Sequence, residues 1–220
     1  QVNSDPYLYF QKGVPIRDAN DFITKEVGGA RGLEVVISTG HEDGVKDPEF
    51  LRKVEAFQIW LEEMPEVSRT LSIVNILKAT NRSLHGDAPE AYKLPDTRPL
   101  IGQELFLYSM SLPEGMDIND QVTDNYDALR LRILWTVSSS KDWIEKRDII
   151  ADYGRNLGLN LTVTGKANLF QSINPYVVDS FIRSISVALV LISILLIAVF
   201  GSVKVGLTAL LPNCIPLIMG

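Results

Sequence analysis

Cysteine and histidine, the residues that most often bind transition metals or form disulfides, are scarce in this chain. Its 220 residues include one cysteine, Cys214, so no disulfide can form within the chain. This scarcity suits a bacterial periplasmic domain. The two histidines, His41 and His85, lie far apart in polar segments, without HxxxH spacing or a nearby cysteine. We interpret them as surface residues, and the sequence predicts neither a metal site nor a cofactor.

Sequence patterns typical of enzymes are also missing. The chain has no phosphate-binding loop, no nucleophile elbow and no paired catalytic acid and base. Asp142 and Glu145 are interpreted as surface charges of one helix. The acidic stretch from Glu114 to Asp127 lacks the glycine and the terminal glutamate of an EF-hand loop, and is interpreted as a solvated loop. We therefore expect a protein without enzymatic activity.

Charge is nearly absent from the C-terminal part of the chain. Residues 184–220 contain a single formal charge, Lys204, and 12 of the 16 residues from Ile185 to Phe200 are Leu, Ile, Val or Phe. Such a composition favours bilayer insertion by about 5 kcal/mol. A bilayer requires about 20 residues, a length reached by extending the run back to Phe181, with Arg183 snorkelling toward the headgroups. The sequence predicts a transmembrane helix over 181–201; the alternative is a buried core helix.

A second apolar run, 205–220, follows the short turn 201–204 and is interpreted as the start of another, truncated transmembrane helix. The two runs then form a membrane hairpin. The turn carries one lysine and no acid, so the positive-inside rule places it in the cytoplasm. We expect the preceding residues to lie on the periplasmic side of a bacterial inner membrane, in a multi-pass protein with a further transmembrane helix before Gln1.

The rest of the chain is polar enough to form a water-soluble domain. Residues 1–183 carry 20 basic and 27 acidic side chains, a net charge of −7, which argues against nucleic-acid binding. About 180 residues suffice for one or two hydrophobic cores. We assign 1–32 to an entry segment and 33–180 to an extracytoplasmic domain.

Two segments of this domain follow the order strand–helix–strand. The first consists of strand 33–39, a helix that starts at Asp47-Pro48-Glu49, and strand 67–73. The second consists of strand 129–137, a helix capped by Ser139 or Ser140, and strand 159–164. The first helix carries an apolar stripe of five residues: Phe50, Val54, Phe57, Leu61 and Met64.

Two such halves predict an α+β fold, a ferredoxin-like split βαβ domain with helices layered on an antiparallel sheet. Between the halves, an insertion over about 74–128 carries a helix at 73–84 and another that follows Pro99. A helix over 15–27, ended by Gly28-Gly29, precedes the first strand. This fold hosts many functions and does not name one.

The tail of the chain, GSVKVGLTALLPNCIPLIMG, resembles the resistance-nodulation-division (RND) superfamily of exporters. The likeness rests on the apolar helix, the short basic turn, Gly206 and the pattern Pro212-Asn213…Pro216. It is strongest to the predicted-exporter branch that includes the mycobacterial large membrane proteins, the MMPL family. The stretch LPDTRPLIGQELFLYSMSLPEGMDINDQV looks like the family's first extracytoplasmic loop.

The resemblance covers nearly the whole chain and implies a role in transport. The chain would hold the first extracytoplasmic, porter-like loop, the second transmembrane helix and the start of the third. The family exports hydrophobic or amphiphilic substrates such as lipids and drugs, driven by proton flux through acidic residues in later helices. Those positions lie outside this chain. Implied partners are membrane lipids and the substrate, with a homo-oligomer or accessory subunits also possible.

The tail motif has a physical interpretation of its own. Pro212 and Pro216 each remove a backbone donor and loosen the helix, whereas Asn213 places a polar side chain in the bundle interior. Gly206 permits close contact between helices. The alternatives are a static kink that serves packing and a flexible segment that serves gating.

Four aromatic residues are candidates to line a substrate cleft, with core packing as the alternative for each: Phe106, Tyr108, Trp135 and Phe170. Two other functions remain open for the chain. It could be a non-transporting, membrane-anchored module that assists protein export or assembly, or a protein that senses lipids or sterols.

Overall fold

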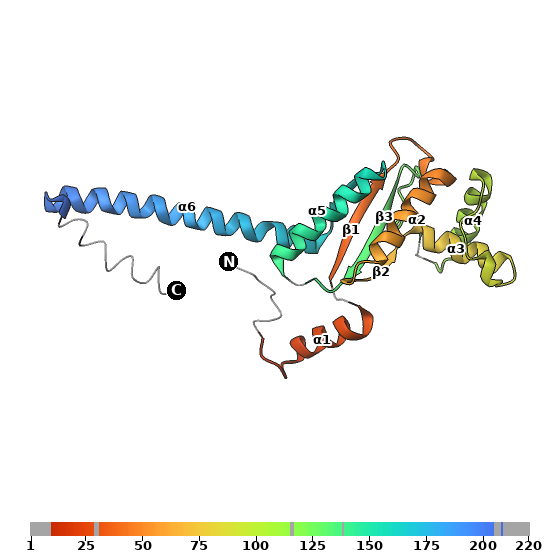
Figure 1. The fold of residues 1–220 in the computed structure, drawn as a ribbon, viewed down its shortest axis with the longest axis horizontal. Helices are drawn as coiled ribbons and strands as arrows, with labels where there is room; N and C mark the ends of the chain where they lie inside the picture. The colour runs from red at the N-terminus through yellow and green to blue at the C-terminus, as the bar shows by residue number, and fades with distance from the viewer. Residues whose placement is uncertain (1–9, 29–30, 115–116, 138, 205–207, 209–220) are drawn as a thin grey trace. The chain divides into compact units, whose positions relative to one another are not determined.

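The computed structural model describes residues 10–28, 31–114, 117–137, 139–204 and 208. The chain divides into two compact units, one that ends at Ser172 and one that begins at Ile173. The first unit contains a four-stranded antiparallel sheet and several helices, so the protein is of the α+β class, as predicted (Figure 1). The described part of the second unit consists mainly of the remainder of one long helix, α6 (Lys166–Phe200).

The sheet is formed by β1 (Arg31–Ser38), β2 (Val67–Leu71), β3 (Ala128–Trp135) and β4 (Asn160–Thr164), in the order β2-β3-β1-β4. Every neighbouring pair is antiparallel. Strands β1 and β3 lie at the centre, with Val35 opposite Leu131. Each strand–helix–strand half therefore contributes one central and one edge strand, and its two strands flank a strand of the other half.

Alternation along the central strands separates two faces of the sheet. On one face, Leu33, Val35 and Ile37 of β1 are completely buried, as are the alternating apolar residues of β3. On the other face, Arg132 Nε lies 3.9 Å from Glu34 Oε1. The predicted alternation of Leu129, Leu131 and Ile133 is confirmed, because all three are buried.

Helices α2 (Pro48–Glu62) and α5 (Ser140–Asn156) contact each other and pack against β2 and β4, respectively. Both start where the sequence predicts. The Asp47 carboxylate accepts a 2.7 Å hydrogen bond from the Glu49 amide, which satisfies one free donor of the first turn. Ser139 caps α5, and Trp143 in its first turn packs edge-on against Trp135, with ring centroids 4.6 Å apart.

The buried stripe of α2 differs from the predicted one. Phe50 and Met64 are only half-buried, whereas Leu51 and Gln58 are buried together with Val54, Phe57 and Leu61. The helix therefore turns a slightly different face to the core than the apolar pattern predicted, and this face includes Leu51 and Gln58. Burial of a polar Gln58 is possible because neighbouring side chains satisfy its amide.

The insertion between β2 and β3 contains α3 (Ile73–Leu84) and α4 (Arg98–Ser111), joined through a single 3-10 turn, η3 (Pro89–Ala91). Both helices match the predicted positions. Ser72 and Asn75 form a capping box at the start of α3. Helix α4 packs against α3 and against η2 (Gly44–Lys46), a 3-10 turn that precedes α2. The insertion is thus attached to the core of the first unit.

The two helices at the ends of the described region also match predictions in part. Helix α1 spans Pro15–Val27 as expected, and Gly28 follows it in the left-handed conformation at φ +90°. Helix α6 reaches Phe200 but begins at Lys166, well before the predicted start at Phe181. The second apolar run, 205–220, lies outside the described residues except for Thr208.

Candidate functional site

Helix α6 is the one helix in the described part of the chain that is long and apolar enough to cross a membrane. It has an ion pair of 3.0 Å between Arg183 and Asp179, after which no charged side chain occurs before Lys204. Two serines interrupt the apolar run, and each donates a hydrogen bond to a carbonyl one turn earlier. Ser186 donates to Ile182 at 2.8 Å and Ser193 to Leu189 at 2.5 Å. These bonds satisfy hydroxyls that hydrocarbon could not solvate.

The start of α6 belongs to the folded first unit. The Gln171 side chain is buried, and its Oε1 accepts a 2.5 Å hydrogen bond from Ser140 Oγ at the start of α5. Arg147 Nη1 of α5 donates to Ser172 Oγ at 3.3 Å, and Asn168 Nδ2 donates to the Val163 carbonyl of β4 at 3.4 Å. Side chains of α5 and the backbone of β4 therefore hold the first residues of α6.

The four candidates for a substrate cleft are placed on three different elements. Phe106 and Tyr108 lie on α4, Trp135 on β3 and Phe170 on α6. Trp135 is buried against Trp143 and serves core packing. Tyr108 is half-buried against the core, whereas Phe106 and Phe170 are 62% and 67% exposed, so core packing is not their role in this structure.

The residues of the tail motif lie outside the described part of the chain: Gly206, Pro212, Asn213 and Pro216.

The surface of the first unit has two hollows, and none of the four aromatic candidates lines either of them.

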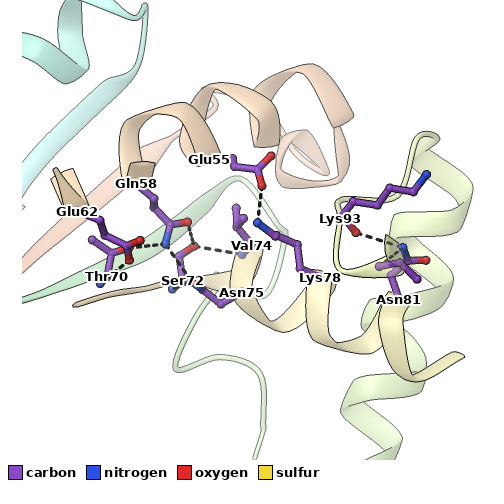
Figure 2. Close-up of polar contacts among 11 residues, drawn as sticks. Glu55, Gln58, Glu62, Thr70, Ser72, Val74, Asn75, Lys78, Asn81 and Lys93 are labelled. Atoms are coloured by element: carbon purple, nitrogen blue, oxygen red, sulfur yellow. Dashed lines mark hydrogen bonds and ion pairs between the residues drawn. The ribbon is translucent and has the colours of Figure 1, made fainter. Parts of the chain in front are cut away.

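The larger hollow, about 430 Å³, lies where the end of α3, the η3 turn and the start of α4 meet. Asn81 forms part of its wall, and the Asn81 Nδ2 donates to the carbonyls of Ala91 at 2.9 Å and Lys93 at 3.2 Å (Figure 2). His85 also lines the hollow. Its Nδ1 lies 2.7 Å from the Asn81 carbonyl, and since a carbonyl only accepts, this nitrogen carries the proton.

A buried carboxylate, Glu104, lies on α4 one turn after Leu100, which lines this hollow. Glu104 is 1% exposed, and neither of its carboxylate oxygens has a hydrogen-bond partner among the described residues. Burial raises the pKa of Glu104 to about 7, against a smaller lowering by the charge of His85. The sequence analysis missed Glu104, although its place between two apolar residues one turn apart, Ile101 and Leu105, was a signal.

A polar cluster connects α2, β2 and α3, and Figure 2 shows its hydrogen bonds. Gln58 Nε2 donates to Thr70 Oγ1 and to Asn75 Oδ1, both at 2.9 Å, while Gln58 Oε1 accepts from Ser72 Oγ at 2.8 Å. Thr70 Oγ1 in turn donates to Glu62 Oε1 at 2.6 Å. Because the members satisfy one another, this cluster attaches the insertion to the sheet layer and is not a site poised for chemistry.

Two ion pairs also connect neighbouring segments of the first unit. Lys78 Nζ of α3 lies 2.7 Å from Glu55 Oε1 of α2, and Lys146 Nζ of α5 lies 2.6 Å from Glu66 Oε1. The hydrogen bond from Lys146 lowers the pKa of Glu66, although desolvation opposes this shift. Among the described residues, no group of three or more His, Cys, Asp and Glu side chains is arranged to hold a metal ion.

No protein-family model matches this chain, and no curated protein matches it either.

Proposed function

We propose that this chain is part of an inner-membrane RND-type transporter of the MMPL branch, which exports hydrophobic or amphiphilic molecules such as lipids and drugs. The observation that carries the proposal is helix α6. Its first residues are hydrogen-bonded into an α+β domain, and the helix is long and apolar enough to cross a bilayer. The resemblance of the tail, including Gly206 and Pro212-Asn213…Pro216, supports the same assignment.

The first unit is proposed to be a ferredoxin-like split βαβ domain of the porter type. Three features support this fold: the strand order β2-β3-β1-β4, the antiparallel pairing of every neighbour, and the two helices α2 and α5 that contact each other. With the turn 201–204 in the cytoplasm, this domain lies on the periplasmic side. Residues 205–220 begin the next transmembrane helix and complete a hairpin.

In this proposal the chain supplies a surface that binds the substrate, and α6 connects the first unit to the membrane. Burial of apolar area, at about 25 cal/mol per Å², provides most of the affinity for an amphiphile. Phe106 and Phe170 are exposed and available for such contacts, with Tyr108 partly available. Membrane lipids surround α6, and a homo-oligomer or accessory subunits complete the assembly. Proton flux through helices outside this chain drives the cycle.

Export from cells tests the proposal. Cells that lack the gene would be complemented with the full-length wild type, with the Pro212→Ala/Pro216→Ala double variant, or with the control Pro113→Ala in the exposed loop after α4. We expect the deletion strain to accumulate an amphiphilic substrate, and the wild type and the control to clear it. The double variant should insert normally and export less, because its stiffer helix opposes the conformational cycle.

Unchanged accumulation of every amphiphile in the deletion strain, together with a defect in protein secretion or assembly, would contradict the transporter proposal. That result would favour the non-transporting module instead. A double variant that exports like the wild type would contradict only the flexible role of the two prolines.

A further inference from the structure

We propose that Glu104 is a proton-sensitive switch, which holds helix α4 docked against the first unit while protonated and loosens this docking when it ionises. The inference goes beyond the proposed transport function and concerns a conformational change within the insertion. It rests on where Glu104 lies, on the absence of a hydrogen-bond partner among the described residues, and on the charges around it.

The position of Glu104 makes its ionised form costly. Helix α4 buries three residues, Ile101, Glu104 and Leu105, each with 1% exposure or less. Both carboxylate oxygens of Glu104 are buried without a hydrogen-bond partner in the described structure. An ionised carboxylate in such a place loses its hydration and gains no hydrogen bond from the protein. A protonated carboxyl group can be buried there at much lower cost in free energy.

Charged groups on the elements packed against α4 relieve this cost only in part. His85, which caps the C-terminal end of α3, is the group whose charge acts on Glu104. Lys78 of α3 pairs with Glu55 at 2.7 Å. From η2, Lys46 Cδ lies 3.9 Å from the point that a Cβ of residue 102 would occupy, but Lys46 Nζ pairs with Asp43 at 2.6 Å.

The two arginines of the same region also have other partners. Arg82 of α3 lies 3.8 Å from Asp87 and stacks over Tyr92. Arg98, at the start of α4, donates to the Asp43 carbonyl at 3.1 Å. His85 is therefore the nearby group that affects the pKa of Glu104, and its charge favours the ionised form of this side chain.

The direction of the pH effect follows from proton linkage. Burial raises the pKa of Glu104 from 4.5 to about 7 in the docked state, whereas an undocked α4 exposes the carboxylate to water. Between these two values the docked state holds a proton that the undocked state lacks. Docking is therefore strongest at low pH, weakens by up to about tenfold per pH unit as pH rises toward 7, and changes little above it.

Loosening of α4 would move an apolar surface. On its other face the helix exposes Phe106, Leu107 and Met110 by 62%, 47% and 69%. A change in docking would shift these side chains relative to the sheet. If the chain belongs to a proton-driven exporter, as proposed above, this switch would respond to pH on the side from which protons enter.

Hydrogen exchange of the full-length protein in detergent, measured from pH 5 to pH 8 and corrected for intrinsic rates, tests the switch independently of transport. We expect protection of α4 amides to fall by up to about tenfold per unit up to pH 7, while α5 serves as internal control. Glu104→Gln and Glu104→Leu should both remove this dependence. His85→Asn should move the transition to higher pH, because it removes the charge that favours ionisation.

Protection of α4 that does not depend on pH in the wild type would overturn the proposal. So would a wild-type slope that persists in both Glu104 variants, since another group would then be responsible. If neither Glu104 variant folds, the wild-type profile and the direction of the shift in His85→Asn still decide the question.

Discussion

Ser140 and Gln171 form a buried hydrogen bond of 2.5 Å between the start of α5 and the start of α6. The serine hydroxyl is the donor and the amide oxygen of Gln171 accepts. Both side chains are at most 6% exposed, so water cannot replace either partner. This contact fixes the beginning of the candidate membrane helix to the domain that precedes it.

Ser140→Ala should therefore lower the free energy of unfolding of the first unit by about 1–3 kcal/mol, the cost of a buried acceptor without a donor. Denaturant unfolding followed by tryptophan fluorescence measures the change, since Trp143 lies in the first turn of α5. Ser172→Ala, which removes only an exposed contact of 3.3 Å to Arg147, is the matched control and should cost less than 0.5 kcal/mol. Equal effects of the two changes would contradict this assignment.

Two glycines within helices should respond in opposite ways to substitution by alanine. A Cβ at Gly154 of α5 would lie 2.1 Å from Leu161 Cδ2 and 3.2 Å from Phe57 Cζ, so Gly154→Ala should destabilise by about 1–3 kcal/mol. At Gly102 of α4 the nearest atom would be Lys46 Cδ at 3.9 Å. Gly102→Ala should stabilise by about 0.5–1 kcal/mol through helix propensity. Thermal melts of both variants check the signs.

The pair formed by Lys146 and Glu66 should stabilise the fold in a pH-dependent way. The hydrogen bond from Lys146 lowers the pKa of Glu66 below 4.5. The ion pair therefore contributes fully to the free energy of unfolding above pH 4.5, and this contribution is lost as the pH falls through the lowered pKa of Glu66. Lys146→Met should cost about 0.5–1 kcal/mol at pH 7, and the difference from wild type should shrink toward pH 3.

Denaturant unfolding at both pH values measures the effect of Lys146→Met. Arg155→Met is the control, because Arg155 and Asp152 form an exposed pair that should contribute little at either pH. A penalty for Lys146→Met that grows on acidification would refute the expected sign.

A charge placed in the helix layer should unfold the domain. Phe57 and Ile150 are completely buried, and Phe57→Asp or Ile150→Asp would place an uncompensated carboxylate there, at a cost of several kcal/mol. The neighbouring positions Ile59 and Ile149 are 55% and 47% exposed. Ile59→Asp and Ile149→Asp should therefore remain folded in circular dichroism, and normal melts for all four variants would contradict the helix layer.

Membrane topology is tested by thiol labelling of the full-length protein in cells. Cys214 would first be replaced by alanine, and single cysteines would then be introduced as Asp87→Cys and Ser202→Cys. Because the basic turn is expected in the cytoplasm, an impermeant reagent should label position 87 from outside and should reach position 202 only after permeabilisation. The reverse pattern would invert the proposed orientation.

Local structure was well predicted from the sequence. Helices 15–27 and 73–84 have the predicted bounds, and Asp47 caps α2 as its position before Pro48 indicated. The alternation in β3 identified its buried face. These features depend on interactions within a few residues of one another, such as caps, turn glycines and the period of apolar side chains, and a linear pattern contains that information.

Which polar residues are buried was decided only by tertiary structure. Glu104 lies between the apolar residues Ile101 and Leu105 of α4, and its burial depends on how α4 packs against α3 and η2. Gln58 can be buried in the core because Thr70, Ser72 and Asn75, which lie outside α2, form hydrogen bonds with its side-chain amide.

Residues far away in the chain likewise contact the first turns of α6. Ser140 lies 31 positions before Gln171, and its hydroxyl satisfies an amide that the local sequence leaves without a partner. Local patterns in the amino-acid sequence located most helices and strands, and they marked the apolar stretch that lies within the long helix α6. Burial, the strand register and the partners of polar groups were determined by the tertiary structure, because they require segments far apart in the chain to meet.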